Sequence, residues 1–464
     1  MFLKKYIGDK LFYKTVLTIA LPMMFQNLIT NFVNLLDNLM VGFLGTEEVA
    51  AVAIVNQLVF IYNLTLFGAV SGAGIFAAQY FGKKDYAGIS YTMRYKTFAC
   101  LLVTLIFGSV FLLFGETLID GYLSDGSYNC DLEKTMVLAK NYFLIIIASF
   151  IPTSITQIYA STLKESGQTF IPMIAGFVAL LVNTTLNLLL IFGIGPFPKL
   201  GVVGAAIGTT VSRVAECAFV LCYIFKNIKK HSYFKGALRS LYIPASDLKM
   251  YLAKGIPLLI NEAMWSAGMS LLTLAYSKYG LAIVASQSIS STVLNFFNIT
   301  FRSLGFAVGI IAGRRLGAEQ FDEAVDEVRK LNAFSVAVSL VIGIIVYNIA
   351  DYVVLMYNVS SEARNWAVFF IKTSAFFVPF LSYENSAYFT LRSGGKILIT
   401  FLMDGFYILV ICVPIAFILQ SLFPIAVTFV CMQFSSVFKA LFGYVFIKRK
   451  TWVCSLVEKR KVSS

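Results

Sequence analysis

Three carboxylates interrupt stretches of this chain that are otherwise almost wholly apolar. Asp37 lies within "FVNLLDNLMVG", Glu262 within "IPLLINEAMW" and Glu384 within "VPFLSYENSAY". Because a charge in an apolar interior is costly, such acids commonly bind a proton or a cation. The chemistry open to these residues is therefore reversible protonation and cation binding. A structural hydrogen bond or a buried ion pair is the alternative for each of them.

Amides accompany the first of these acids. Asn27, Asn31 and Asn34 precede Asp37 in steps of three to four residues. This spacing places side chains on one face of a helix. The pattern predicts a polar stripe that faces protein or water rather than lipid.

A second polar cluster is predicted in and after "VNTTLNLLLIFG". Asn183 and Asn187 share a helix face, and Thr209 follows on the next helix. Amide and hydroxyl oxygens can replace the hydration shell of Na⁺ or hold a proton-carrying water network. We therefore predict a cation-coupling set of Asp37, Glu262, Asn183, Asn187 and Thr209. Interhelical hydrogen bonding, at about 0.6 kcal/mol per bond, is the alternative for the amides.

Other polar and aromatic side chains are candidates for a substrate cavity. An aromatic face attracts a flat organic cation, and a few placed polar groups fix its orientation. These candidates are Asn34, Gln26, Trp265, Gln157, Tyr383 and Glu384. Ordinary packing is the alternative for the aromatic ones.

The sequence lacks the motifs of the common catalytic sites. It contains no G-x-x-x-x-G-K-[ST] loop, no G-x-S-x-G elbow and no H-E-x-x-H pair. The chain has a single histidine, His231, which we predict to be a solvated loop residue. We expect no enzyme activity, no cofactor and no metal site. An ion gradient of Na⁺ or H⁺ remains as the energy source.

The composition is that of an integral membrane protein. Hydrophobic residues make up 58% of the chain, charged residues 13%, and the mean hydropathy is +0.80. Twelve apolar runs are long enough to cross a hydrocarbon core of about 30 Å as helices. The predicted spans are 16–43, 49–81, 92–114, 136–163, 168–193, 201–225, 251–279, 284–312, 331–357, 365–391, 397–420 and 424–447.

The basic residues separate by side of the membrane. Of the 37 Lys and Arg, 28 fall in the termini and in the alternate loops on the N-terminal side. The positive-inside rule then places both termini in the cytoplasm of a multi-pass protein of the inner (cytoplasmic) membrane. Because the charge is explained by topology, we expect no nucleic-acid partner.

The chain reads as a duplication. A shift of 235 positions superposes "ALPMMFQNLI" on "GIPLLINEAM", and the Pro and Gly residues at helix ends coincide. An even number of spans per half gives a parallel repeat, related by a pseudo-twofold axis along the membrane normal. We predict an all-α fold of two six-helix lobes, 1–225 and 251–447. A cytoplasmic linker, 226–250, joins them, and a basic cytoplasmic tail, 448–464, follows.

The stretches "ALPMMFQNLITNFVNLLDNLMVGFLGTEEVAAVAI" and "NTTLNLLLIFGIGPFPKLGVVGAAIGTTVS" resemble the multidrug and toxic compound extrusion (MATE) transporters. The resemblance implies a two-lobed antiporter that exports cationic, amphipathic compounds in exchange for Na⁺ or H⁺. It also implies that Asp37, in the first predicted span (16–43), is the coupling acid of that span. Glu262, in the seventh predicted span (251–279), matches an acid on the seventh span of other members. Some prokaryotic members have an Asn and an Asp four apart on the fifth span, near the acid of the first span. Here Asn183 and Asn187 leave the second carboxylate missing.

We therefore expect a secondary active antiporter that works by alternating access. Its partners would be small organic cations and membrane lipid, and the protein would be a monomer. One alternative is a flippase for a lipid-linked sugar or cell-wall precursor, for which Arg213 and Arg302 are the candidate phosphate contacts. Another is a membrane scaffold that does not transport.

Overall fold

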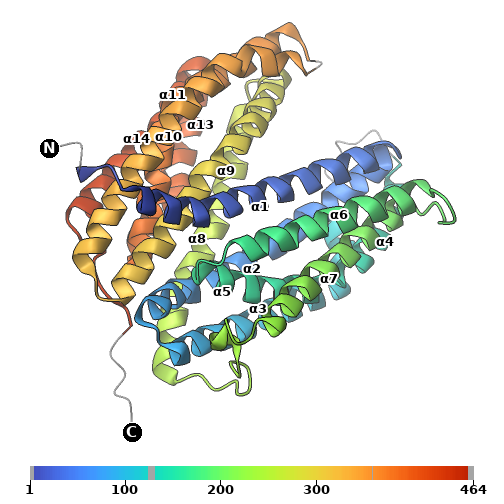
Figure 1. Cartoon of the computed structure of the whole chain (residues 1–464). Coiled ribbons are helices and arrows are strands. Elements are labelled where there is room, and N and C mark those ends of the chain that lie inside the picture. Colours follow the sequence, from blue (N-terminus) through green and yellow to red (C-terminus); the bar gives the residue numbers. More distant parts are fainter. Residues whose placement is uncertain (1–4, 124–130, 358, 458–464) are drawn as a thin grey trace. The chain divides into compact units, whose positions relative to one another are not determined.

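The computed structural model describes residues 5–123, 131–357 and 359–457. These residues are almost entirely helical and include no β-strand (Figure 1). The helices of the first half are α1 (Lys10–Gly42), α2 (Thr46–Lys83), α3 (Tyr86–Leu123), α4 (Leu132–Ile147), α5 (Phe150–Glu165), α6 (Phe170–Phe192) and α7 (Val202–Lys226), followed by the 3-10 turn η2 (Ser232–Phe234). Those of the second half are α8 (Ala245–Ser277), α9 (Leu281–Gly317), α10 (Phe321–Leu355), α11 (Ser361–Ser393), α12 (Ile397–Met403), the π-helical turn η3 (Tyr407–Cys412), α13 (Val413–Leu422) and α14 (Ile425–Lys448).

Each of the twelve predicted spans corresponds to helix in the structure. Within the described residues, eleven helical segments are individually long and apolar enough to cross a membrane, and a bent pair, counted as one span, brings the number to twelve. That pair is α4 and α5, which meet at 45° within the predicted span 136–163. The predicted span 397–420 is interrupted by the π-helical turn. Such turns are rare in proteins, and those that occur are often at functional sites.

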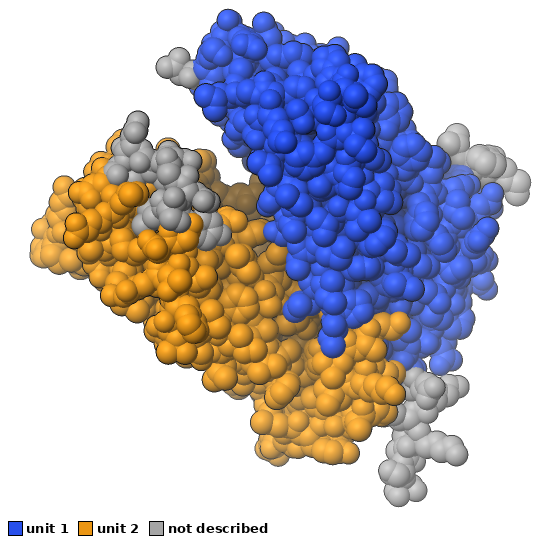
Figure 2. Space-filling model, turned by 180° about the vertical axis from the view of Figure 1, so that it is seen from behind, with its two compact units in different colours: residues 1–24, 75–85, 256–464 blue, residues 25–74, 86–255 orange. Residues whose placement is uncertain are grey.

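The described residues form two compact units. Unit 1 contains residues 1–24, 75–85 and 256–464, and unit 2 contains residues 25–74 and 86–255 (Figure 2). The boundaries cut through α1, α2 and α8, so each of these helices contributes to both units. These units differ from the lobes, linker and tail expected from the sequence, which are continuous stretches of the chain. The boundaries of those lobes, linker and tail stay a prediction.

Unit 1 closes over a short C-terminal segment, residues 451–457, which we call the C-terminal strap. Trp452 is 1% exposed and belongs to the same apolar core as the N-terminal part of α1. The backbone N–H of Leu456 donates to Gln79 Oε1 at 2.7 Å, and Gln79 Nε2 donates to the Ser393 carbonyl at 2.9 Å. Gly394 has no side chain because a Cβ there would overlap the Trp452 carbonyl. The strap therefore joins α2 to the end of α11 inside this unit.

Unit 2 packs around aromatic stacking and a close helix pair. The ring of Tyr62 on α2 stacks on Phe150 of α5 with centroids 3.9 Å apart. Gly204 and Gly208, spaced as G-x-x-x-G, let α7 approach α6 closely: a Cβ on Gly204 would overlap the Leu190 carbonyl of α6. Small residues at this spacing are typical of tightly packed membrane helices.

The prediction that His231 is solvated is wrong. Its side chain is 2% exposed, and its Nδ1 lies 2.9 Å from the Tyr233 hydroxyl. The rings of Tyr223, Tyr233 and Phe234 surround the imidazole. Burial, followed by the charge of Lys230, lowers the pKa of His231, which favours the neutral ring. This linker histidine is therefore a packed residue.

Candidate cation-binding site

A chain of hydrogen bonds in unit 2 joins four of the five predicted coupling residues. Asn187 Nδ2 donates to Asp37 Oδ1 at 2.6 Å and lies 3.4 Å from Asn183 Oδ1. Asn183 Nδ2 in turn donates to Thr209 Oγ1 at 3.3 Å. The four side chains come from α1, α6 and α7. The structure thus brings the acid of the first span together with the polar cluster predicted nearly 150 residues further on.

The two amides are held in position by helix packing. Asn183 and Asn187 are one turn apart on α6 and are 1% and 0% exposed. Asn187 lies against Gly208, where a Cβ would overlap its Oδ1. That oxygen is buried and accepts no hydrogen bond within the described part of the chain. A buried acceptor without a donor is costly unless a water or an ion satisfies it.

One guanidinium lies near this site. Arg213 on α7 is close enough for its charge to act on Asp37, yet its Nη1 donates to Glu216 Oε2 at 2.9 Å. Arg213 thus already has a carboxylate partner of its own. The half-buried Asp37 carboxylate and the orphan Asn187 oxygen together offer oxygen ligands for a small cation or a proton.

Replacement of Gly208 by Ala is expected to impair this site. The added methyl overlaps Asn187 Oδ1, so the amide must leave Asp37 or the helices must separate. A hydrogen bond to a charged group is worth about 1.5–3 kcal/mol, so we expect transport to fall by about tenfold or more. Gradient-driven dye efflux measures this. The matched control is Gly108→Ala on α3, where a Cβ meets nothing within 4 Å and activity should be retained; equal activity of the two variants would contradict the packing argument.

Unit 1 holds a second charged cluster, built on Glu384. Lys439 Nζ of α14 donates to Glu384 Oε1 at 3.0 Å and lies 3.7 Å from Asp404 Oδ1. Asn261 Nδ2 donates to Asp404 Oδ2 at 3.0 Å, and the Gly405 N–H donates to Asn261 Oδ1 at 2.9 Å. Lys439 and Asn261 were not among the predicted site residues. The signal for Lys439 was its isolation: it is a lone cation in the middle of the last span.

Glu262, the fifth predicted coupling residue, belongs to unit 1 and so lies in a different unit from Asp37. It is half-buried beside Asn261 on α8, and the charges of Arg392, Asp404 and Arg302 act on it. Among the cavity candidates, Trp265 and Tyr383 lie in unit 1 and are half-buried, as is Glu384; Gln26, Asn34 and Gln157 lie in unit 2. In the described chain, the only hydrogen bond that a side chain of these six makes is that of Glu384 with Lys439.

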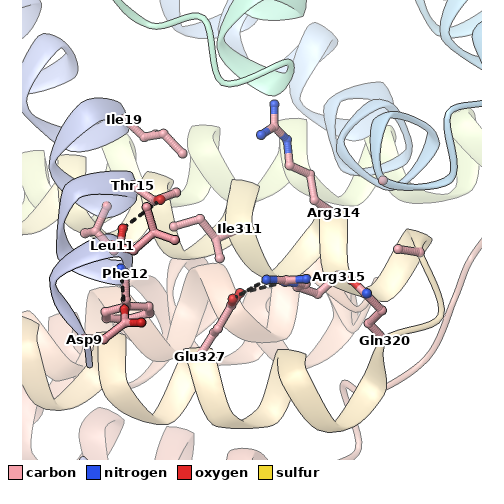
Figure 3. Close-up of a pocket in the computed structure, with 13 residues that line it drawn as sticks. Asp9, Leu11, Phe12, Thr15, Ile19, Ile311, Arg314, Arg315, Gln320 and Glu327 are labelled. Carbon is pink, nitrogen blue, oxygen red and sulfur yellow. Dashed lines mark hydrogen bonds and ion pairs between the residues drawn. The ribbon is translucent and has the colours of Figure 1, made fainter. Parts of the chain in front are cut away.

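A pocket of about 470 Å³ lies elsewhere in unit 1, between the start of α1 and the ends of α2 and α9 (Figure 3). The Arg315 guanidinium in its wall is clamped by Glu327, with Nε–Oε2 at 3.0 Å and Nη2–Oε1 at 2.6 Å. None of the predicted site residues lines it. No group of three or more His, Cys, Asp or Glu side chains suited to a metal ion occurs in the described ranges.

Ionisable residues inside a multi-span helical fold commonly mark the path of a substrate or an ion. The family profile MatE matches residues 22–189 and again residues 257–422. The two matches start 235 residues apart, which is the shift that superposes the halves of the sequence. The chain therefore belongs to the MatE family, a family of multidrug efflux transporters, and has its two-lobed repeat of six spans each.

Relatives of known name extend over the same length. The chain is 24% identical to "Probable multidrug resistance protein YoeA" of Bacillus subtilis, with 96% of each chain covered. It is 22% identical to "Probable multidrug resistance protein NorM" of Thermotoga maritima, in an alignment that covers 97% of this chain and 94% of the relative. "Multidrug export protein MepA" of Staphylococcus aureus is 24% identical over 78% of this chain and 77% of its own.

Solved structures support the fold. "Crystal structure of MATE in the bent conformation" superposes with a TM-score of 0.84 at 19% identity, covering 97% of this chain and 98% of the other. "Outward-facing conformation of a multidrug resistance MATE family transporter of the MOP superfamily" has a TM-score of 0.82 at 19% identity and covers 96% of both chains.

Proposed function

We propose that this transporter is a secondary active antiporter that exports cationic, amphipathic compounds in exchange for Na⁺ or H⁺. The observation that carries the proposal is the Asp37 site. The Asp37 carboxylate accepts a hydrogen bond from Nδ2 of the fully buried Asn187, whose oxygen Oδ1 accepts no hydrogen bond within the described residues. A carboxylate inside the membrane is costly when charged, so binding of a cation or a proton to it is favourable. Ion entry is then coupled to export if binding of the ion and binding of the exported cation exclude each other.

Each residue of the predicted coupling set has a part in this proposal. Asp37 exchanges the ion or proton, Asn187 and Asn183 orient it, and Thr209 supports the amides. Glu262 is a second acid in the other unit and adjusts the affinity for the exported cation. Alternating access arises because ion and substrate each favour a different state of the protein. The protein acts as a monomer with both termini in the cytoplasm.

The test uses purified protein in liposomes loaded with ethidium. A Na⁺ gradient and a pH gradient are imposed separately, each directed inward, and dye efflux is followed by fluorescence. We expect one of the two gradients to accelerate efflux over liposomes without a gradient. Protein-free liposomes control for leakage of the dye.

If neither gradient changes the rate of dye efflux from liposomes that contain inserted and folded protein, the antiport proposal is overturned. The next substrate to test would then be a pyrophosphate-linked lipid, as expected of a flippase. One of the two candidate phosphate contacts for that alternative is already engaged, because Arg213 donates to Glu216 Oε2.

A further inference from the structure

Lys439 lies where a bound cation would lie, between two carboxylates of unit 1. We propose that it sets the charge of the exported compound: the site formed by Glu384, Asp404 and Lys439 accepts an organic cation with one positive charge and disfavours a dication. The proposal rests on the proposed export of cations. In addition, it makes Lys439 a specificity-determining residue, because Lys439 would decide which charge of substrate is bound.

The geometry is that of two acids sharing one resident ammonium. Lys439 Nζ is 3.0 Å from Glu384 Oε1 and 3.7 Å from Asp404 Oδ1. The side chains are 8% exposed for Lys439, 14% for Glu384 and 24% for Asp404, so Asp404 is the most accessible of the three. Asn261 holds the other oxygen of Asp404 and is itself fixed by the Gly405 N–H. The acids are therefore positioned before any ligand arrives.

Counting charges gives this triad an excess of one negative charge. Two carboxylates, those of Glu384 and Asp404, face the one ammonium of Lys439. Asp404, the half-buried acid at the longer distance from the ammonium, is the more accessible of the two carboxylates. Lys439 Nζ also lies over the face of the Tyr407 ring, 5.6 Å from its centroid, so this ring already contacts the resident cation.

Such a site selects by charge. The attraction between a site and a ligand grows in proportion to the ligand's charge, whereas the Born cost of stripping water from it grows with the square. A site with one excess negative charge therefore favours a monocation. Without Lys439 the same two acids have two excess charges, which favours a dication.

The experiment compares two dyes with the same phenanthridinium ring, ethidium with one charge and propidium with two. Binding to the purified full-length protein is titrated by fluorescence. We expect the wild type to bind ethidium about tenfold more tightly than propidium, and Lys439→Met to reverse the order. Lys439→Arg should keep it, because the charge remains. Lys372→Met is the matched control: Lys372 pairs with Asp351 at a more exposed place in the same unit, and its loss should not change the ratio.

The outcomes separate the two proposals. An unchanged ratio in folded Lys439→Met protein that binds both dyes overturns the role of Lys439 and leaves the export function standing. If that variant does not fold, Asp404→Asn decides, because it makes the triad neutral: a loss of ethidium binding of about tenfold supports the inference, and unchanged binding overturns it. A wild type that binds neither dye overturns the export of cations, and this inference with it.

Discussion

Asp37→Asn is expected to reduce gradient-driven ethidium efflux to the level of protein-free liposomes. The asparagine keeps an oxygen that accepts the 2.6 Å hydrogen bond from Asn187 Nδ2. Helix packing around the site therefore stays intact, and the melting temperature should not change. What is lost is the charge, so the site no longer exchanges a proton or binds Na⁺. Efflux measured beside a thermal melt of the same preparation tests this.

The matched control is Asp351→Asn, the same change at an acid on α10 that is 56% exposed and paired with Lys372. It should retain wild-type efflux. Glu262→Gln, in the other unit, should slow efflux without abolishing it. Full coupling in Asp37→Asn would remove Asp37 from the mechanism, and complete loss in Glu262→Gln alone would move the coupling site to unit 1.

The second large effect is expected at a buried ion pair in unit 2. Lys96 on α3 has a fully buried side chain, and its Nζ is 2.5 Å from Glu165 Oε2 at the end of α5. The hydroxyls of Ser161 and Thr162 accept further bonds from it, at 3.2 and 3.3 Å. Breaking a buried pair by removing one partner costs about 3–5 kcal/mol, because the other charge remains uncompensated. Lys96→Met should therefore lower the melting temperature by roughly 10 °C.

A double-mutant cycle separates this cause from loss of packing. Lys96→Met combined with Glu165→Met removes both charges, and we expect it to recover most of the stability. Lys140→Met is the control, because Lys140 pairs with Glu116 at the surface, where such bridges are worth about 0–1 kcal/mol. If the double variant is as unstable as the single one, the ion pair is not the source of the effect.

The spans were predictable because a run of apolar residues has only one way to cross lipid with its backbone hydrogen bonds satisfied. That Asn183 and Asn187 share a face was predictable from helical spacing, whereas Thr209 is on the next helix and is found in the structure to accept a hydrogen bond from Asn183. That Asp37 would join them was implied by resemblance and is found in the structure as a hydrogen bond. Helical periodicity is local, so it orders side chains on one helix and says little about which helix lies opposite.

That limit explains what sequence reasoning missed. Lys439 was visible as a lone cation, but its partners Glu384 and Asp404 are on other helices and no spacing rule connects them. Asn261 was passed over because the adjacent Glu262 has the charge. The burial of His231 depends on aromatic rings that fold back over it, and a loop of mixed composition gives no periodic signal for that.

The C-terminal strap has a consequence for how the protein is made. Leu456, which bonds Gln79, follows it by 377 residues, so the ribosome adds the strap long after α2 has entered the membrane. Until then, Gln79, which is fully buried in the finished protein, lacks this partner. Unit 2, by contrast, has all its residues once residue 255 is made. The residues of unit 2 are thus complete before those of unit 1, and a chain cut short before the strap leaves Gln79 Oε1 without the N–H of Leu456.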